Sequence, residues 1–199
     1  MGKIKSAWEI ALEKTEGMEI DQEKIRHNTG IDRIRRTAGQ YITADEGEEN
    51  EEELKKKLSA SDPALVREAL TGTIINSMVL PQEKESAEKK TARIRTLLQI
   101  AFPSEDILSY YDQICQHLSQ YPEHREKLME QLKAQIEPML KEKEAAMREK
   151  YGQPVHLTIE NDKESLEMVR NYLDRLTGQY QGTLDEAKER MKSLLENYR

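Results

Sequence analysis

The chain has 199 residues, of which 35% are charged and 36% hydrophobic, and its formal net charge is −7 at pH 7. A negative balance of this size opposes binding to phosphate backbones and to anionic lipid surfaces, so neither nucleic acid nor a membrane is an expected partner. Nearly half of the residues are Ala, Glu, Leu, Lys or Arg, a composition typical of long helices.

The strongly apolar residues are scarce, because Leu, Ile, Val and Phe together make up only about one fifth of the chain. Two paired helices need apolar residues at only about two positions in seven, so this small number of apolar residues can still stabilise long helices. The single cysteine, Cys115, excludes an internal disulfide, and no apolar stretch approaches the length of a membrane span or a signal-peptide core. We therefore expect an elongated, cytoplasmic, all-α protein.

The first 44 residues are expected to form N-terminal helices. Ile4, Trp8 and Leu12 share one face of an amphipathic helix over 3–16, and Gly17 follows it at the position where helices commonly end. A second, less regular helix is expected after Asp21, with an apolar pattern formed by Ile25, Ile31, Ile34, Ala38 and Ile42.

Residues 45–61 are expected to form an acidic linker, because seven of the nine residues from Asp45 to Glu53 are acidic. Their order does not match the calcium-binding loop of an EF-hand. At most, a helical turn is expected around Leu54 and Leu58.

Residues 62–121 are expected to form a three-helix body. Asp62 is a suitable N-cap and Pro63 a suitable first residue for a helix that ends before Pro81. A second helix ends where Phe102-Pro103-Ser104 interrupts the pattern, and Ser104 is a suitable cap for the third.

Residues 122–199 are expected to form a long antiparallel helical hairpin. Its first helix begins near Glu123, and Pro138 predicts either a kink or two shorter helices around residue 137. Gly152-Gln153-Pro154 ends this segment, and 155–159 could form at most one short strand.

The last helix begins after the capping residue Asp162 and carries apolar residues in a heptad pattern with one stutter. Gly178 and Gly182 flank the stutter, so the pattern leaves open whether the helix is continuous. Because so thin a stripe leaves apolar edges exposed in a monomer, it is also the candidate interface for another copy, with a dimer favoured, or for another helical protein. Its residues are Leu166, Val169, Leu173, Leu176, Tyr180, Leu184, Met191, Leu194 and Tyr198.

Residues suited to catalysis or metal binding do not form a known pattern. None of the four histidines stands in a Glu-x-x-His or His-Glu-x-x-His sequence, and the glycines form no phosphate-binding loop. A metal site made of Cys115, His117 and His124 would require an unwound turn, since residues two apart point to different faces of a helix. We therefore expect no catalytic residue, no cofactor and no metal.

Two blocks of sequence resemble a known family. They are Lys-Ile-Lys-Ser-Ala-Trp-Glu-Ile-Ala-Leu-Glu-Lys-Thr-Glu-Gly at 3–17 and the charged segment 156–192, which contains Leu-Thr-Gly-Gln-Tyr-Gln-Gly-Thr-Leu-Asp-Glu-Ala-Lys-Glu-Arg-Met-Lys. Together they resemble an uncharacterised bacterial protein family of unknown function. The resemblance implies a bacterial, cytoplasmic origin and supplies no activity.

The sequence thus favours a non-enzymatic structural or interaction protein that self-associates through long amphipathic helices. The alternative is a chaperone-like or regulatory protein that binds a helical or disordered client through its body. An enzyme is the third possibility, and it would require a polar pocket in which carboxylate, His or Cys side chains converge.

Overall fold

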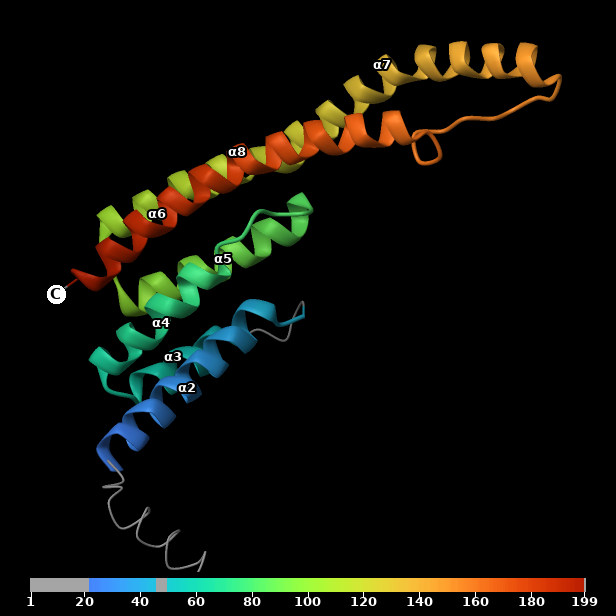
Figure 1. Ribbon diagram of the computed structural model, residues 1–199. Helices are drawn as coiled ribbons and strands as arrows, with labels where there is room; N and C mark the ends of the chain where they lie inside the picture. The colour runs from blue at the N-terminus through green and yellow to red at the C-terminus, as the bar shows by residue number, and fades with distance from the viewer. Residues whose placement is uncertain (1–21, 46–49, 199) are drawn as a thin grey trace, which may run out of the picture.

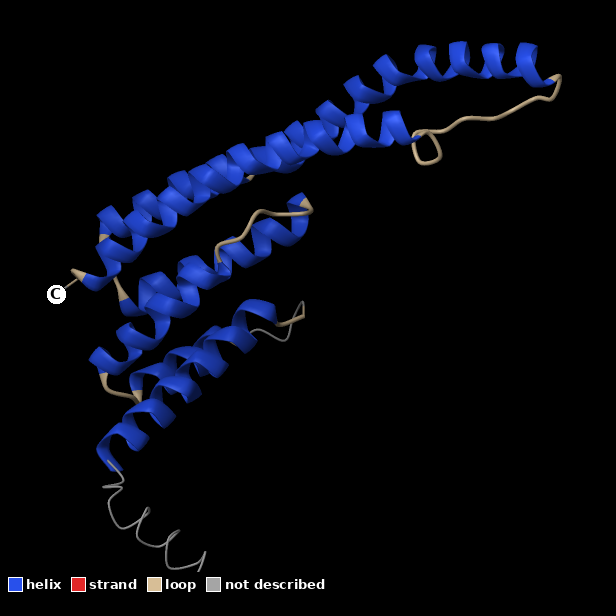
Figure 2. Ribbon diagram, in the orientation of Figure 1, coloured by secondary structure: helices blue, strands red, loops and turns tan. Residues whose placement is uncertain are grey.

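The computed structural model describes residues 22–45 and 50–198, and these are entirely helix or loop. No strand occurs among these residues, so the all-α class is confirmed, and 155–159 is loop (Figure 1, Figure 2). The expected helix over 3–16 lies outside the described part of the chain. The helices are α2 (Gln22–Thr43), α3 (Glu51–Ser59), α4 (Pro63–Ser77), α5 (Lys84–Ala101), α6 (Glu105–Leu118), α7 (Gln120–Tyr151) and α8 (Lys163–Glu196).

Several helix ends have the local chemistry that the sequence predicts. The Asp62 carboxylate accepts hydrogen bonds from the backbone N–H groups of Ala64 and Leu65, and Pro63 is the first residue of α4. Gly152 ends α7 with a φ of 72°, the left-handed conformation that glycine adopts without steric cost. These residues therefore fix where the chain turns.

The segment predicted as an acidic linker contains a helix, α3, and the prediction is wrong over Glu51–Ser59. Asn50 caps this helix, because its side-chain oxygen accepts a hydrogen bond of 2.9 Å from the backbone N–H of Glu53. Leu54 and Leu58, one turn apart, are both buried in the main core. The acidic residues thus lie on the solvent side of a helix that two leucines hold in place.

The sequence predicts a break between the body and the last third of the chain, but in the structure this break is very short. α7 begins at Gln120 rather than near Glu123, and Pro122 lies in its first turn, where a missing N–H is tolerated. Ser119, between α6 and α7, keeps a helical backbone, with φ −63° and ψ −18°. α6 and α7 therefore follow one another as a nearly continuous rod.

Two predictions about helix continuity are decided by the structure. α7 runs through Pro138 as one helix, and Figure 1 shows it curving away from α8 toward its far end. α8 also runs unbroken past Gly178 and Gly182. Ser104 precedes α6 as predicted, but its side chain makes no capping hydrogen bond.

The main core draws on more of the chain than the expected body of 62–121. It contains buried residues from α2 to α6 and also from the last half of α8, namely Leu184, Met191 and Leu195. α2 approaches α4 closely at Gly30, where an added Cβ would lie 2.7 Å from a methyl carbon of Leu65. Residues 122–199 are therefore not a separate hairpin, because α8 completes the body.

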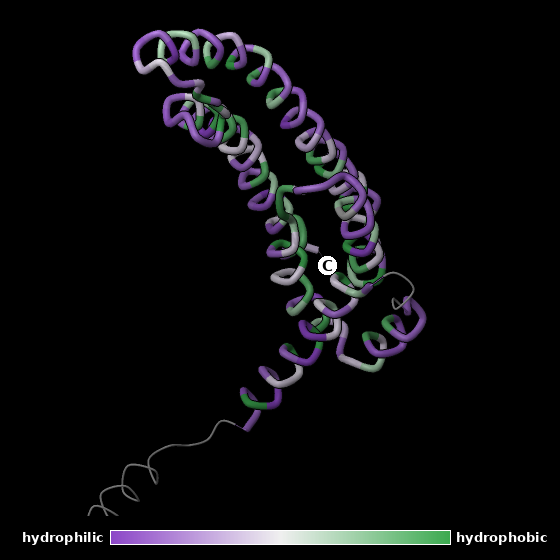
Figure 3. Tube along the Cα trace, turned by 90° about the vertical axis from the view of Figure 1, so that its right-hand side faces the viewer, coloured by the Kyte–Doolittle hydropathy of each residue, from purple (hydrophilic) through white to green (hydrophobic). Residues whose placement is uncertain are grey.

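A second, smaller core joins the middle of α7 to the first half of α8. Its buried residues are Leu132, Ile136, Leu140 and Val169. We call residues 125–175 the arm, because this part of α7 and α8 extends beyond the body (Figure 1). The outermost turns of α7, at the top of Figure 3, are mostly hydrophilic with single apolar residues between them.

Candidate interaction surface

The arm joins the body at a cluster of aromatic rings around Tyr180 of α8. The ring of His117 from α6 stacks on Tyr180 with the centroids 4.9 Å apart, and Tyr121 from α7 meets it edge-on at 5.1 Å. The Tyr180 hydroxyl oxygen lies 2.6 Å from Nδ1 of His124. Rings from three helices thus hold α8 against the junction of α6 and α7.

The polar atoms of this cluster are only partly paired. The hydroxyls of Tyr121 and Thr177 lie 3.0 Å apart, whereas Nε2 of His117 is buried without a hydrogen-bond partner. Burial raises the pKa of the Tyr180 phenol, so the hydroxyl keeps its proton. The rings of the cluster therefore contribute mainly by packing, and only Tyr180 and His124 pair their polar atoms with each other.

In the structure, Cys115, His117 and His124 do not come together as a metal site. α6 is unbroken here, so His117 faces Tyr180 while Cys115 faces α5 across an apolar pocket. Burial raises the pKa of the Cys115 thiol, which disfavours the thiolate that a metal requires. Throughout 22–45 and 50–198, no three His, Cys, Asp or Glu side chains are grouped to hold a metal ion.

The structure places most of the predicted interface against other helices of the same chain. Val169 lies in the arm core, Tyr180 in the aromatic cluster, and Leu184 and Met191 in the main core. The half-buried remainder is Leu173, Leu176, Leu194 and Tyr198. Only Leu166 is exposed, at 43%, so the stripe mainly serves folding of the single chain.

The described apolar surface that remains exposed on the arm is concentrated near its far end. α8 begins level with Lys143 of α7, because the Lys143 ammonium contacts Asp162 at 2.9 Å and Glu164 at 2.7 Å. α7 continues for about two more turns to Tyr151, and none of the described helices lies beside these turns (Figure 1).

These two unpaired turns continue the apolar stripe of α7. Met147 is 39% exposed and Tyr151 62% exposed, and Val155 in the following loop is 36% exposed. We call Met147, Tyr151, Val155 and Leu166 the arm tip. The apolar spacing of α7 in the sequence already includes Met147. The overhang, however, depends on where α8 begins, and the length of the 152–162 loop is the only feature of the sequence that indicates this position.

Ion pairs and hydrogen bonds hold the loop of the arm tip in place. The Glu144 carboxylate accepts a hydrogen bond of 2.6 Å from the backbone N–H of Leu157 and lies 3.2 Å from the ring of His156. Leu157 and Ile159 pack against the arm core. The tip is thus a supported surface rather than an isolated helix end.

The chain was compared with protein families, curated proteins and solved structures. Residues 51–193 match a family described as a family of unknown function, DUF6657. The chain belongs to this family. The resemblance to an uncharacterised family is thereby confirmed, although the match lies outside the block at 3–17. No curated protein and no solved structure matches the chain.

Within the described residues, no helix of this DUF6657 protein has both the length and the apolar character needed to cross a membrane.

Proposed function

We propose that this DUF6657 protein is a non-enzymatic interaction protein that self-associates through its arm tip. The observation that supports this role is the overhang of α7, which leaves Met147 and Tyr151 exposed beyond the point where α8 begins. A helix with an apolar stripe is stabilised mainly by packing, so two bare turns at the end of a long arm favour association.

A second copy is the partner that best suits this surface. The segment from Lys141 to Tyr151 alternates basic and acidic residues around two alanines, Ala145 and Ala146. Two such segments packed in antiparallel orientation, in register about Ala146, would place opposite charges near each other. Symmetric contacts of this kind are the commonest in homodimers.

The proposal is tested by sedimentation velocity over a range of protein concentrations. The informative variant combines Met147→Glu with Tyr151→Lys, which leaves the net charge unchanged and adds a helix-supporting Glu–Lys pair four residues apart. We expect the dissociation constant of the dimer to rise by about tenfold or more, because apolar anchors contribute most of the binding energy at interfaces.

A matched control makes the same exchange on α2. Ile25 is 53% exposed, and Ile25→Glu with Thr29→Lys removes exposed apolar surface far from the arm. This control should associate like the wild type. A wild-type protein that remains monomeric at every concentration would refute self-association and favour the alternative, a binder of a helical client.

Truncation at residue 122 is not a suitable test, because it would remove Leu184, Met191 and Leu195 from the main core. The cytoplasmic location and the absence of catalysis remain predictions from sequence.

A further inference from the structure

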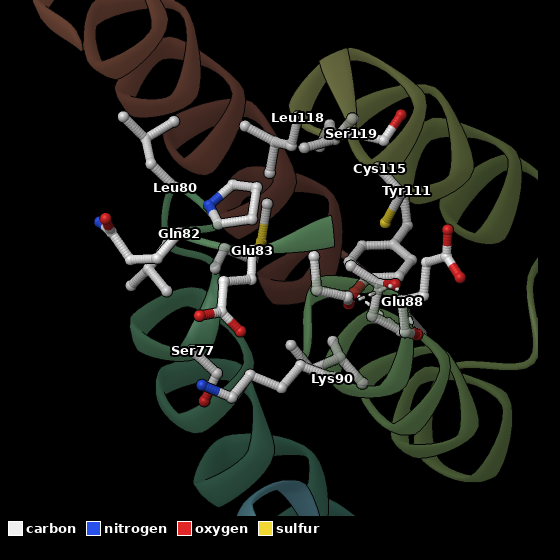
Figure 4. A pocket seen from close by; sticks show the side chains of 17 residues that line it. Ser77, Leu80, Gln82, Glu83, Glu88, Lys90, Tyr111, Cys115, Leu118 and Ser119 are labelled. Carbon is white, nitrogen blue, oxygen red and sulfur yellow. Dashed lines mark hydrogen bonds between the residues drawn. The ribbon is translucent and has the colours of Figure 1, made fainter. Parts of the chain in front are cut away.

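An apolar pocket lies in the body, away from the arm tip. It is enclosed by the connection between α4 and α5, the first half of α5 and the last half of α6. Its volume is about 210 Å³. Figure 4 shows Leu80 and Gln82 on one side, with Tyr111 and Cys115 facing them from α6.

The interior of the pocket is apolar and its polar atoms are already engaged. Met78, Ile94 and Leu118 line it and are almost fully buried. The Tyr111 hydroxyl donates a hydrogen bond of 3.1 Å to the backbone carbonyl of Thr91. Since Tyr111 and Cys115 are both protonated groups in an apolar environment, the interior offers no charge to a ligand.

The charged side chains around the pocket are Glu83, Glu88 and Lys90, of which two are acidic and one is basic. A ligand with an anionic group would be repelled more than attracted at such a rim. The size also restricts the ligand, because apolar cavities of about 150 Å³ in protein cores hold one benzene ring.

From this geometry we infer that the body contains a binding site for a small neutral apolar molecule, of the size of a single aromatic ring or a short aliphatic chain. Such a ligand would displace water from a surface that cannot hydrogen-bond it, which is the main contribution to binding in apolar sites. The site is independent of self-association through the arm tip.

The reactivity of Cys115 can report whether the pocket is occupied, because Cys115 is the sole cysteine of the chain and lines the pocket. The probe is toluene, and the readouts are the rate of Cys115 alkylation and the thermal midpoint of the full-length protein. We expect toluene to slow alkylation in a saturable manner and to raise the midpoint, since a ligand that binds only the folded state stabilises it. Benzoate, which adds a carboxylate to the same ring, should protect Cys115 much less.

The matched variants are Ala87→Leu and Ala64→Leu. Ala87 lines the pocket, so the added carbons occupy part of the space, whereas Ala64 is exposed on α4 and serves as the control. Ala87→Leu should weaken toluene binding by about tenfold, which corresponds to about 1.4 kcal/mol, and Ala64→Leu should leave it unchanged.

Three results would overturn the inference. They are the absence of saturable protection up to the solubility limit of toluene, equal protection by benzoate, and undiminished protection in a folded Ala87→Leu variant. If Ala87→Leu does not fold, Ala87→Val makes the same test with a smaller side chain.

Discussion

At the scale of single residues, the buried cation Arg93 links two parts of the body. Arg93 is 8% exposed, and its guanidinium donates hydrogen bonds to the backbone carbonyls of Ile42 at 3.1 Å and Ala44 at 2.6 Å. These carbonyls lie at the C-terminal end of α2, where the helix dipole is negative and a cation is favourable. Arg93 thus caps the C-terminal end of α2, although it lies far from α2 in the sequence.

Replacing this cation should cost much stability. Arg93→Met keeps much of the side-chain volume but leaves the carbonyls without their charged donor, so the free energy of unfolding should fall by about 2–3 kcal/mol. Urea denaturation measures this loss. Arg95→Met is the control, because the Arg95–Asp112 pair is exposed to solvent and should contribute much less to stability. Equal losses in both variants would contradict the role of Arg93.

Asp162 predicts a pH dependence of stability. Hydrogen bonds from the Ser165 hydroxyl, Lys143 and the Ser165 backbone lower its pKa to about 2 in the folded protein. Because an ordinary aspartate has a pKa of about 3.9, its contribution is present above pH 4 and is lost as the pH falls toward 2. The difference in urea midpoint between wild type and Asp162→Asn should therefore shrink over that range.

The matched control for this titration is Asp32→Asn, which neutralises an exposed carboxylate on α2. A difference between wild type and Asp162→Asn that stays constant from pH 5 to pH 2 would contradict the proposed cause.

At the scale of elements, the two cores should respond differently to a cavity. Ile136 is fully buried, but its neighbours belong to the arm core alone. Ile136→Ala should cost about 2–5 kcal/mol locally and let the arm open while the body stays folded. Hydrogen exchange should then show faster exchange in the arm, with the slow amides of α4 and α5 unchanged.

Leu70→Ala is the comparison for that experiment, because Leu70 is fully buried in the main core. It should accelerate exchange throughout the body. If Ile136→Ala does the same, the arm and the body unfold as one unit.

The sequence predicted several helix ends, because caps depend on neighbouring residues, although Ser104 makes no capping hydrogen bond and α7 begins before Glu123. Asp62 with Pro63, Asp162 and Gly152 act within one turn, so their effect is visible in the sequence. Composition was misleading for α3, where acidic residues concealed two buried leucines. Periodicity correctly marked the apolar stripe of α8 but could not say which helices would cover it.

The site depended on the relative positions of distant segments, which spacing does not reveal. The arm tip exists because α8 begins two turns short of the end of α7, and the pocket exists because the α4–α5 connection meets α6. Arg93 and the carbonyls of α2 are likewise far apart in sequence. No local pattern could have joined these groups.

At the scale of the whole molecule, α8 belongs to both cores and makes the arm an extension of the body. Leu184 and Met191 anchor its last half, and Val169 packs against α7 in its first half. Because α6 and α7 lie along it as a nearly continuous rod, the arm has a rigid base. We therefore expect the protein to be extended in solution.

Small-angle scattering at low concentration checks this expectation. A compact chain of 199 residues would have a radius of gyration of about 16 Å, and the projecting arm should raise it clearly above that value. The sharpest comparison replaces residues 145–155 with a short Gly-Ser linker, which leaves Leu157 and Ile159 on the arm core. The linker can close because the Glu144 carboxylate accepts a hydrogen bond of 2.6 Å from the backbone N–H of Leu157. The shortened protein should have a smaller radius and lose the concentration dependence that the arm tip produces. A radius near 16 Å for the wild type would mean that the arm folds back on the body, and the overhang of α7 would then be unavailable to a second copy.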